Sequence, residues 1–245
     1  FMARNHKQLG DLPTAESSYL QAVDLRRRLL RQNPTDPTKV ISLADALRGL
    51  GTIRDNQDDF QGAIDVISEA RDALNKLLEQ EPDNTQARLA LASCFHVLGA
   101  VSNELNESEE ARSYHQSSVD VLVAILDTED QRGEEIKAEL SRYLNELGRN
   151  QRKLEDISGA EASHLKSIEL REQLVTQFPT TPEYRSLLAD AYINLGVVYK
   201  QNDRSEEAKE LYGNAIEMLT KLVQEFPAVR KYRYSLGVTL HNTAN

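Results

Sequence analysis

The chain has 245 residues, a formal net charge of −10, 6% aromatic residues and no tryptophan. Its content of Leu, Ala and Glu favours helices and argues against a β-rich fold. The negative charge disfavours nucleic acids and anionic membrane surfaces as partners, because like charges repel one another.

The single cysteine, Cys94, excludes an internal disulfide and a cysteine-based zinc site. No apolar run approaches the roughly 18 residues of a membrane span, so we expect no membrane insertion. With no signal peptide visible, these features favour a cytoplasmic protein. The chain begins at Phe1, and we expect it to be a piece of a longer protein.

The sequence repeats with a period of 48 residues, lengthened once to 49. The anchor is a leucine followed by a glycine, at 50–51, 98–99, 147–148 and 195–196, with Met2-Ala3 one period earlier. The residues twelve after the anchor glycine are Ala15, Ala63, Ala111, Ala160 and Ala208. Those sixteen after it are Tyr19, Ile67, His115, His164 and Tyr212. So many columns in register predict a helical repeat, with small residues where paired helices approach closely.

In chain order, the columns predict a partial repeat at 1–35, complete repeats at 36–82, 83–130, 131–179 and 180–227, and a partial repeat at 228–245. Together they form one solenoid over 1–245, cut inside a helix at both ends. The stretch 126–135 is irregular, because it lacks the proline found in the other repeats and carries the extra residue. We expect a looser joint there.

Helix starts are marked by capping signals. Asp36-Pro37 and Thr181-Pro182 each place a capping oxygen before a proline in the first turn. Ser108 and Ser205 each precede a pair of glutamates, which favours a helix N-terminus. The prolines at 34, 82, 179 and 227 mark the ends of the second helices.

The pattern Tyr192-x2-Leu195-Gly196-x2-Tyr199, followed by Ala208-x3-Tyr212, resembles the tetratricopeptide repeat (TPR). The period departs from that family by about 14 residues, since a TPR has about 34. We assign about seven of these residues, two helical turns, to each helix, which keeps the buried face in register. The added turns of the second helix carry their own apolar columns, namely Leu29, Leu77, Ile125, Leu174 and Leu222, then Leu30, Leu78, Leu126, Val175 and Val223. The resemblance implies an all-α, TPR-like right-handed solenoid of antiparallel helix pairs, with each helix about 20 residues long.

A narrower resemblance concerns the segment "EYRSLLADAYINLG" at 183–196, with Tyr232-Arg233 one period later. It is similar to the long TPRs that follow the kinase domain in some bacterial serine/threonine protein kinases. The chain itself has no glycine-rich phosphate loop, His-Arg-Asp or Asp-Phe-Gly motif, so it would be a non-catalytic part of such a protein.

No residue set indicates catalysis or a bound cofactor or metal. His115 and His164 share a column, and a metal or catalytic pair is one interpretation of them. The interpretation that we favour is that they replace the aromatic residue of that column, because no carboxylate or cysteine column accompanies them. Cys94 stands in a column of small residues and has no paired base. The acidic runs at 107–110 and 206–207 are interpreted as solvated helix starts. We therefore expect no enzymatic activity in this chain.

In TPR proteins the first helices line a concave groove that binds peptides. The resemblance places the groove positions six and three residues before the glycine, and one and four after it. From these columns we select as partner-groove residues Arg48, His96, Asn103, Arg142, Asn145, Arg149, Arg152 and Lys200. The three arginines at 142, 149 and 152 form a local positive patch suited to carboxylates or phosphates. The alternative is a solvated face balanced by Glu139 and Glu146.

Chaperone-binding TPRs use a clamp with Lys three before the glycine and Asn one after it. Here those pairs read Arg48/Thr52, His96/Ala100, Asn145/Arg149 and Ile193/Val197. None matches, so a chaperone-type clamp is not expected.

Three functions remain open. The first is an interaction scaffold that holds a protein or peptide, acidic or phosphorylated, in its groove. The second is a regulatory or sensor region of a bacterial serine/threonine kinase. The third is a self-assembly module that associates end to end.

Overall fold

The computed structural model describes residues 12–127 and 133–244 of the chain. These ranges contain ten α-helices and no strand. The chain divides into two compact units, an N-terminal unit of residues 1–127 and a C-terminal unit of residues 128–245. No helix in the described ranges is long and apolar enough to cross a membrane.

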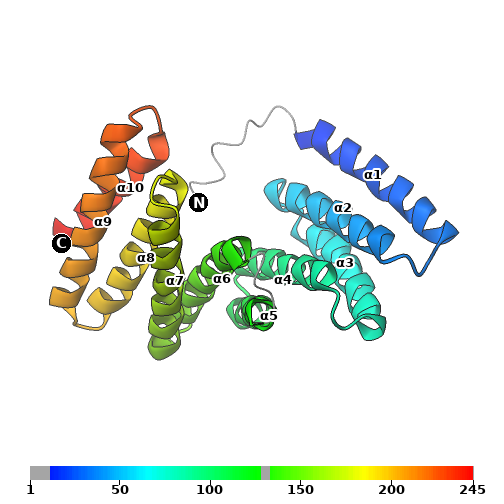
Figure 1. Cartoon of the computed structure of the whole chain (residues 1–245), viewed down its shortest axis with the longest axis horizontal. Helices are drawn as coiled ribbons and strands as arrows, with labels where there is room; N and C mark the ends of the chain where they lie inside the picture. Colours follow the sequence, from blue (N-terminus) through cyan, green and yellow to red (C-terminus); the bar gives the residue numbers. More distant parts are fainter. Residues whose placement is uncertain (1–11, 128–132, 245) are drawn as a thin grey trace. The chain divides into compact units, whose positions relative to one another are not determined.

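Each unit is a stack of helices in which every helix packs against the next one along the chain (Figure 1). The N-terminal unit contains α1 (Leu12–Gln32), α2 (Pro37–Asn56), α3 (Phe60–Gln80), α4 (Thr85–Glu104) and α5 (Ser108–Leu126). The C-terminal unit contains α6 (Gly133–Lys153), α7 (Ile157–Gln177), α8 (Pro182–Gln201), α9 (Ser205–Glu225) and α10 (Arg230–Ala244). First helices of successive repeats also touch, since α2 packs against α4, α6 against α8 and α8 against α10. The predicted helix length of about 20 residues is confirmed for α1 to α9, which have 19 to 21.

The anchor glycines are the points where the two helices of a pair come closest. A Cβ added at any of them would lie within 2.8 Å of a side-chain atom of the residue sixteen positions later. The pairs are Gly51 with Ile67, Gly99 with His115, Gly148 with His164 and Gly196 with Tyr212. The interpretation of this column as a close-approach position is therefore confirmed in all four repeats.

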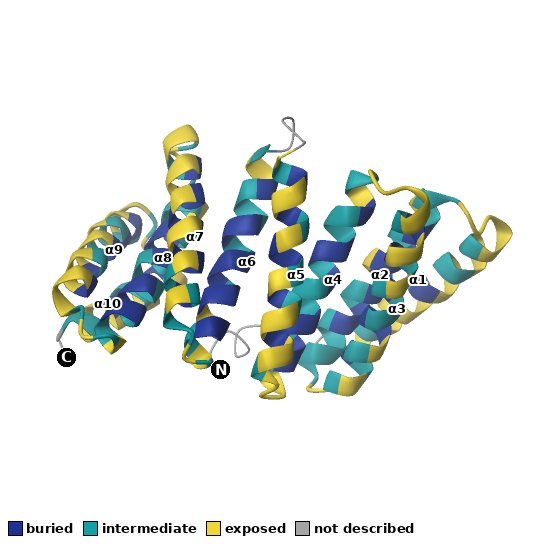
Figure 2. Cartoon of the chain, turned by 90° about the horizontal axis from the view of Figure 1, so that it is seen from below, coloured by how far each residue is buried: buried dark blue, intermediate teal, exposed yellow. Residues whose placement is uncertain are grey.

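The predicted core columns lie between the paired helices. Figure 2 shows buried residues on the inner sides of the helices and exposed residues along the outer sides of α7 and α9. In the first added column Leu77, Ile125, Leu174 and Leu222 are buried, as predicted. In the second, Leu78, Val175 and Val223 are partly buried and pack against the core clusters. Leu29 differs, with 40% of its surface exposed, because α1 packs mainly against α2.

The cap predictions are confirmed only in part. Asp36 accepts a hydrogen bond from the Thr38 amide at 3.0 Å, with Pro37 in the first turn. Thr181 precedes α8 but makes no side-chain cap, so that prediction was wrong. Ser108 and Ser205 are the first helical residues rather than caps. Their hydroxyls are one position too late to cap the helix.

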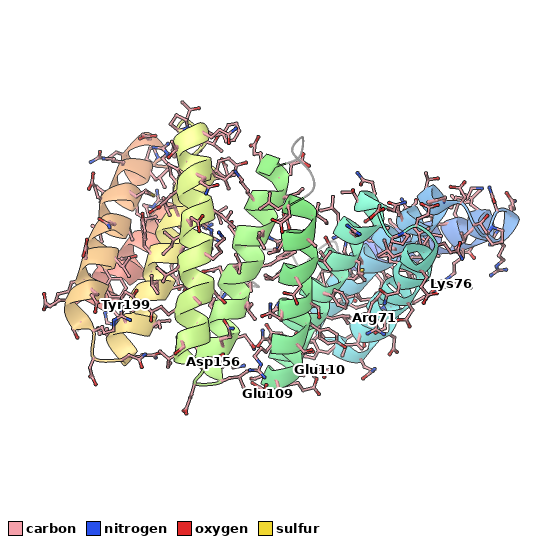
Figure 3. The ribbon with its side chains drawn as sticks, turned by 60° about the horizontal axis from the view of Figure 1, so that its bottom comes forward. Arg71, Lys76, Glu109, Glu110, Asp156 and Tyr199 are labelled. Carbon is pink, nitrogen blue, oxygen red and sulfur yellow. The ribbon has the colours of Figure 1, made fainter. Side chains whose placement is uncertain are left out.

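Three capping side chains were not expected from the sequence. Asp59, Asn84 and Asp156 each accept a hydrogen bond at 3.0 Å from the amide of the residue three positions later. Figure 3 shows Asp156 at the turn that joins α6 to α7. Asp59 and Asp156 begin second helices and Asn84 begins a first helix, so caps of this kind serve both helices of a repeat.

The turn inside each repeat contains a residue in left-handed conformation. These residues are Asp58, Asn106, Glu155 and Asp203, with φ between 60° and 64°, and each lies seven positions after the anchor glycine. Asp and Asn tolerate this conformation better than other side chains. Glu155 is the exception in the column, and it carries the strain of a long side chain at positive φ.

The boundary between the two units falls at 127/128, inside the irregular stretch 126–135. Residues 128–132 of that stretch, and the partial first-repeat anchor Met2-Ala3, lie outside the described residues. The looser joint, and a single solenoid over 1–245 with the repeat boundaries given above, stay predictions.

Replacing Gly196 by Ala should lower the free energy of unfolding by about 1–3 kcal/mol, because the new Cβ would lie 2.5 Å from the buried Tyr212 ring. Gly213→Ala in α9 is the control, since a Cβ there meets no described atom within 4 Å. It should stabilise the chain by roughly 0.5 kcal/mol through helix propensity. Urea unfolding followed by circular dichroism measures both. Equal effects of the two substitutions would contradict the close-approach interpretation.

Replacing Glu155 by Asn should raise the free energy of unfolding by up to about 1 kcal/mol, because Asn tolerates the left-handed conformation that this turn requires. Glu155→Ala is the control and should give no such gain, since alanine keeps the steric cost without a local hydrogen bond. The same urea titration measures both variants. A gain for alanine as large as for asparagine would mean that charge, rather than conformation, is responsible.

Candidate partner-binding site

A cavity of about 390 Å³ lies in the C-terminal unit, among the first helices α6, α8 and α10. Three of the selected groove residues, Arg142, Asn145 and Arg149, line it from α6. The same columns in α8 contribute Asp190 and Ile193. Five of the eight groove positions in α6 and α8 therefore line one cavity within this unit.

Arg142 and Arg149 reach the cavity but are also paired on their own helix. Arg142 forms an ion pair with Glu139, and Arg149 forms one with Glu146 at 3.2 Å. All four side chains are at least one-third exposed, so each pair contributes little to stability. Glu139 and Glu146 therefore neutralise these arginines, as the alternative interpretation of this face expects. Because the pairs are weak, each arginine can bind another anion at low cost.

Arg152 and Lys200 do not line this cavity. Arg152 Nη1 donates to Gln201 Oε1 at 3.1 Å, which links the ends of α6 and α8. Lys200 Nζ donates to the carbonyl oxygen of Asn242 at 2.8 Å, which links α8 to α10. Partial burial and the neighbouring Arg149 lower the pKa of Arg152.

Asn145 is buried and acts as an acceptor rather than as an open groove residue. Its Oδ1 lies 3.1 Å from Asn194 Nδ2 and 3.2 Å from His164 Nδ1. Because Oδ1 can only accept, this contact places the His164 proton on Nδ1. Asn145 therefore connects the cavity to the histidine beneath Gly148.

The other three selected residues lie in the N-terminal unit. Arg48 forms an ion pair with Asp45 at 3.6 Å. His96 lies with its ring centroid 5.7 Å from that of His115, and Asn103 Nδ2 lies 3.2 Å from His115 Nε2. His96 and Asn103 thus meet at His115 of α5, while Arg48 stands on α2.

Arg171 of α7 also lines the cavity, and the sequence reasoning missed it. It belongs to a second helix, whereas only first-helix columns were searched. A signal was present, because Arg171 lies 23 positions after its anchor glycine, in the column of Leu74, Leu122 and Leu219. Those leucines are at most 1% exposed. Among the complete repeats only this one has a cation in the column, and the partial first repeat has another, Arg26.

Arg171 is 2% exposed and bridges three helices. Its Nη2 donates to the Ser141 carbonyl at 3.1 Å, its Nε to Ser141 Oγ at 3.3 Å, and its Nη1 to the Leu187 carbonyl. Ser141 itself stands in a column of alanines, with Ala44, Ala92 and Ala189 in the other repeats. The polar residues Arg171 and Ser141 thus replace leucine and alanine in the same repeat, and they are hydrogen-bonded to each other.

Burial lowers the pKa of Arg171 to about 10, against the opposing effect of Asp190 and Glu146, so the guanidinium stays charged at neutral pH. The pKa of His164 is lowered to about 4 by burial, and further by the positive charges of Arg171, Arg152 and Arg149. The floor of the cavity is therefore a region of positive potential within an acidic chain.

The cysteine, the two column histidines and the acidic run at the start of α5 have structural rather than chemical roles. Burial raises the pKa of the Cys94 thiol to about 12, so it is a neutral core residue. His115 and His164 belong to different units, and each packs against its anchor glycine as an aromatic residue does. Figure 3 shows Glu109 and Glu110 at the exposed start of α5. Among the described residues no group of three or more His, Cys, Asp or Glu side chains could hold a metal ion.

Comparison with known proteins supports the repeat interpretation. Residues 67–116 and 189–218 each match a family model of the tetratricopeptide repeat. Comparison with curated proteins gave no significant match.

Several solved structures share the fold at low sequence identity. The crystal structure of BtubC (BKLC) from P. vanneervenii has a TM-score of 0.66 and 19% identity, covering 95% of this chain and 89% of that chain. A putative kinesin light chain from Podosopora anserina, with nearly identical TPR-like repeats, has a TM-score of 0.56 and 19% identity, covering 90% and 93%. The apo form of RapI has a TM-score of 0.60 and 14% identity, covering 98% of this chain and 63% of that chain. Two segments of the chain thus match the TPR, and the chain has an all-α, TPR-like solenoid fold.

The low pKa of His164 predicts a loss of stability in mild acid. Between about pH 6.5 and pH 4 the unfolded chain binds a proton at this residue while the folded chain does not. The free energy of unfolding should therefore fall by about 2 kcal/mol from pH 7.5 to pH 5.0. The variant His164→Tyr introduces the residue found at this position in the next repeat, Tyr212. It should remove most of this fall, as measured by urea titrations at the two pH values. An unchanged fall in the variant would contradict the prediction.

Proposed function

We propose that this chain is a non-catalytic interaction scaffold that binds a peptide or protein segment, acidic or phosphorylated, in the cavity of its C-terminal unit. The observation that carries the proposal is the meeting of Arg142, Arg149 and Arg171 around one cavity lined by α6, α8 and α10. Guanidinium groups bind carboxylate and phosphate in two-pronged geometry.

The size and lining of the cavity support a segment rather than a whole domain as the inserted group. A volume of about 390 Å³ lies at the low end of small-ligand pockets, which suits one or two side chains. Tyr234 and Val238 of α10 add an exposed apolar wall beside the cationic floor. The selected residues Arg48, His96 and Asn103 would offer a second contact surface on the N-terminal unit.

Two further functions remain as proposals. The resemblance of 183–196 to kinase-associated TPRs favours a regulatory region of a bacterial serine/threonine kinase, which is compatible with a scaffold. End-to-end self-association is the other, and a monomer mass that stays constant with concentration would argue against it.

The scaffold proposal predicts that peptides selected on the chain from a random displayed library lose affinity when the cavity charge is reversed. The variant is Arg142→Glu, Arg149→Glu, Arg152→Glu, which reverses two arginines that line the cavity and the neighbouring Arg152. We expect at least tenfold weaker binding by fluorescence anisotropy, because these cations become repulsive to an anionic ligand.

The control reverses three lysines of the second helices α7 and α9, each ion-paired within its own helix: Lys166→Glu, Lys209→Glu, Lys221→Glu. It changes the net charge equally and should leave affinity within about twofold. If both variants weaken binding alike, only the overall charge matters. If neither does, recognition lies outside this cavity.

A further inference from the structure

We propose that Arg171 forms the floor of an anion subsite in the cavity of α6, α8 and α10, which takes one carboxylate or phosphate of the bound segment beside an apolar side chain. This inference rests on the proposed function and specifies which group of the partner enters the cavity. It depends on a second-helix residue that the groove columns do not contain.

Arg171 is a buried cation that forms no ion pair within the described part of the chain, although Asp190 and Glu146 lie near enough to act on its pKa. Among the described carboxylates, the two that also line the cavity are engaged with other cations. Asp190 lies 3.5 Å from Lys231 Nζ, and Glu146 lies 3.2 Å from Arg149. The acceptors of Arg171 itself are neutral, namely two carbonyl oxygens and one hydroxyl. Removing a guanidinium from water without an anionic partner is unfavourable, so a ligand anion would supply the missing charge.

The guanidinium of Arg171 is held in place and does not use all of its donors in these bonds. Three of its five N–H groups donate to Ser141 and Leu187, which holds the group between α6 and α8. These bonds use three N–H groups and leave two, and because Arg171 lines the cavity, we expect a ligand anion to accept from them. A donor whose position is fixed before binding loses little entropy when the anion arrives.

The cavity around Arg171 combines positive charge with apolar side chains. The lining residues Arg142, Arg149 and Arg171 outnumber the acidic pair Glu146 and Asp190, so the cavity is net positive. Ile193, Tyr234 and Val238 line it as well, and the last two are more than one-third exposed. The fitting group is therefore an acidic or phosphorylated residue with an adjacent aromatic or aliphatic side chain.

The packing of α6, α7 and α8 does not require a charge at this position. Three other repeats build the same joint with leucine in this column and alanine in the column of Ser141. The double variant Arg171→Leu, Ser141→Ala restores that arrangement. It should fold at least as stably as the natural chain, since a packed leucine replaces a buried charge.

The experiment uses the full chain labelled with ¹⁵N at arginine, and follows the Nε–Hε resonances in NMR titrations. The probes are 3-phenylpropionate, phenyl phosphate and the neutral 3-phenylpropanamide. We expect saturable shifts of the Arg171 and Arg149 resonances with both anions and none with the amide. A larger effect of phenyl phosphate would indicate a phosphorylated partner, and a larger effect of 3-phenylpropionate a carboxylate partner.

The variants make the test specific. With Arg171→Leu, Ser141→Ala, the Arg149 resonance should report at least tenfold weaker anion binding, while helicity and the urea midpoint stay the same or rise. Arg112→Leu, which removes an exposed arginine of α5 paired with Glu109, should bind the anions as the natural chain does. Unchanged binding in the double variant, or equal shifts with the amide, would overturn the anion subsite.

Failure of the subsite can be told apart from failure of the proposed function. If the anions do not bind at Arg171 but selected peptides still require Arg142, Arg149 and Arg152, only the subsite is wrong. If the anions bind but no peptide requires these arginines, the subsite stands and the peptide scaffold is wrong.

Discussion

The close approach of paired helices at the anchor glycine is the constraint on which the rest of each unit depends. Without a Cβ at Gly51, Gly99, Gly148 or Gly196, the side chain sixteen residues later can lie directly against the backbone of the first helix. This contact fixes the rotation of one helix against the other. It therefore decides which columns enter the core and which face the cavity. The residue in contact varies among isoleucine, histidine and tyrosine, so the geometry tolerates different ring or branched shapes but requires the missing Cβ.

Much of this arrangement could be predicted from the sequence, because it follows from spacing. The glycine contacts, the buried column of Leu77, Ile125, Leu174 and Leu222, and the helix lengths are properties that a period of 48 residues already contains. What spacing does not contain is local backbone geometry. The left-handed turn residue is Asp or Asn in three repeats but Glu155 in the remaining one. The residue types in this column therefore did not predict the left-handed conformation. The serine caps were predicted wrongly for a related reason, since a shift of one residue moves Ser108 and Ser205 from the cap into the helix.

The candidate site was predicted in part, and its missing member is the most informative. Arg142, Asn145 and Arg149 were found because first-helix columns point to a groove in the resembling family, and the cavity contains them. Arg171 was missed because a second-helix position was assumed to be core. It is core by burial, yet it is also part of the cavity wall. The other complete repeats have leucine at the position of Arg171 and alanine at the position of Ser141. These two departures from the repeat were the signal in the sequence.

The arginines of the cavity divide by how their charge is satisfied, and this division indicates how a partner would be recognised. Arg142 and Arg149 have glutamate partners on their own helix and are largely solvated, so a ligand anion would only replace one weak pair by another. Such residues steer a ligand and adjust the rate of encounter more than they fix its identity. Arg171 forms no ion pair with a described carboxylate, is held by three hydrogen bonds and is shielded from water. A ligand that lacks an anion would leave that charge as it is, whereas one that supplies an anion gains an interaction strengthened by burial. Discrimination between acidic and neutral segments would therefore depend on Arg171 more than on the exposed Arg142 and Arg149.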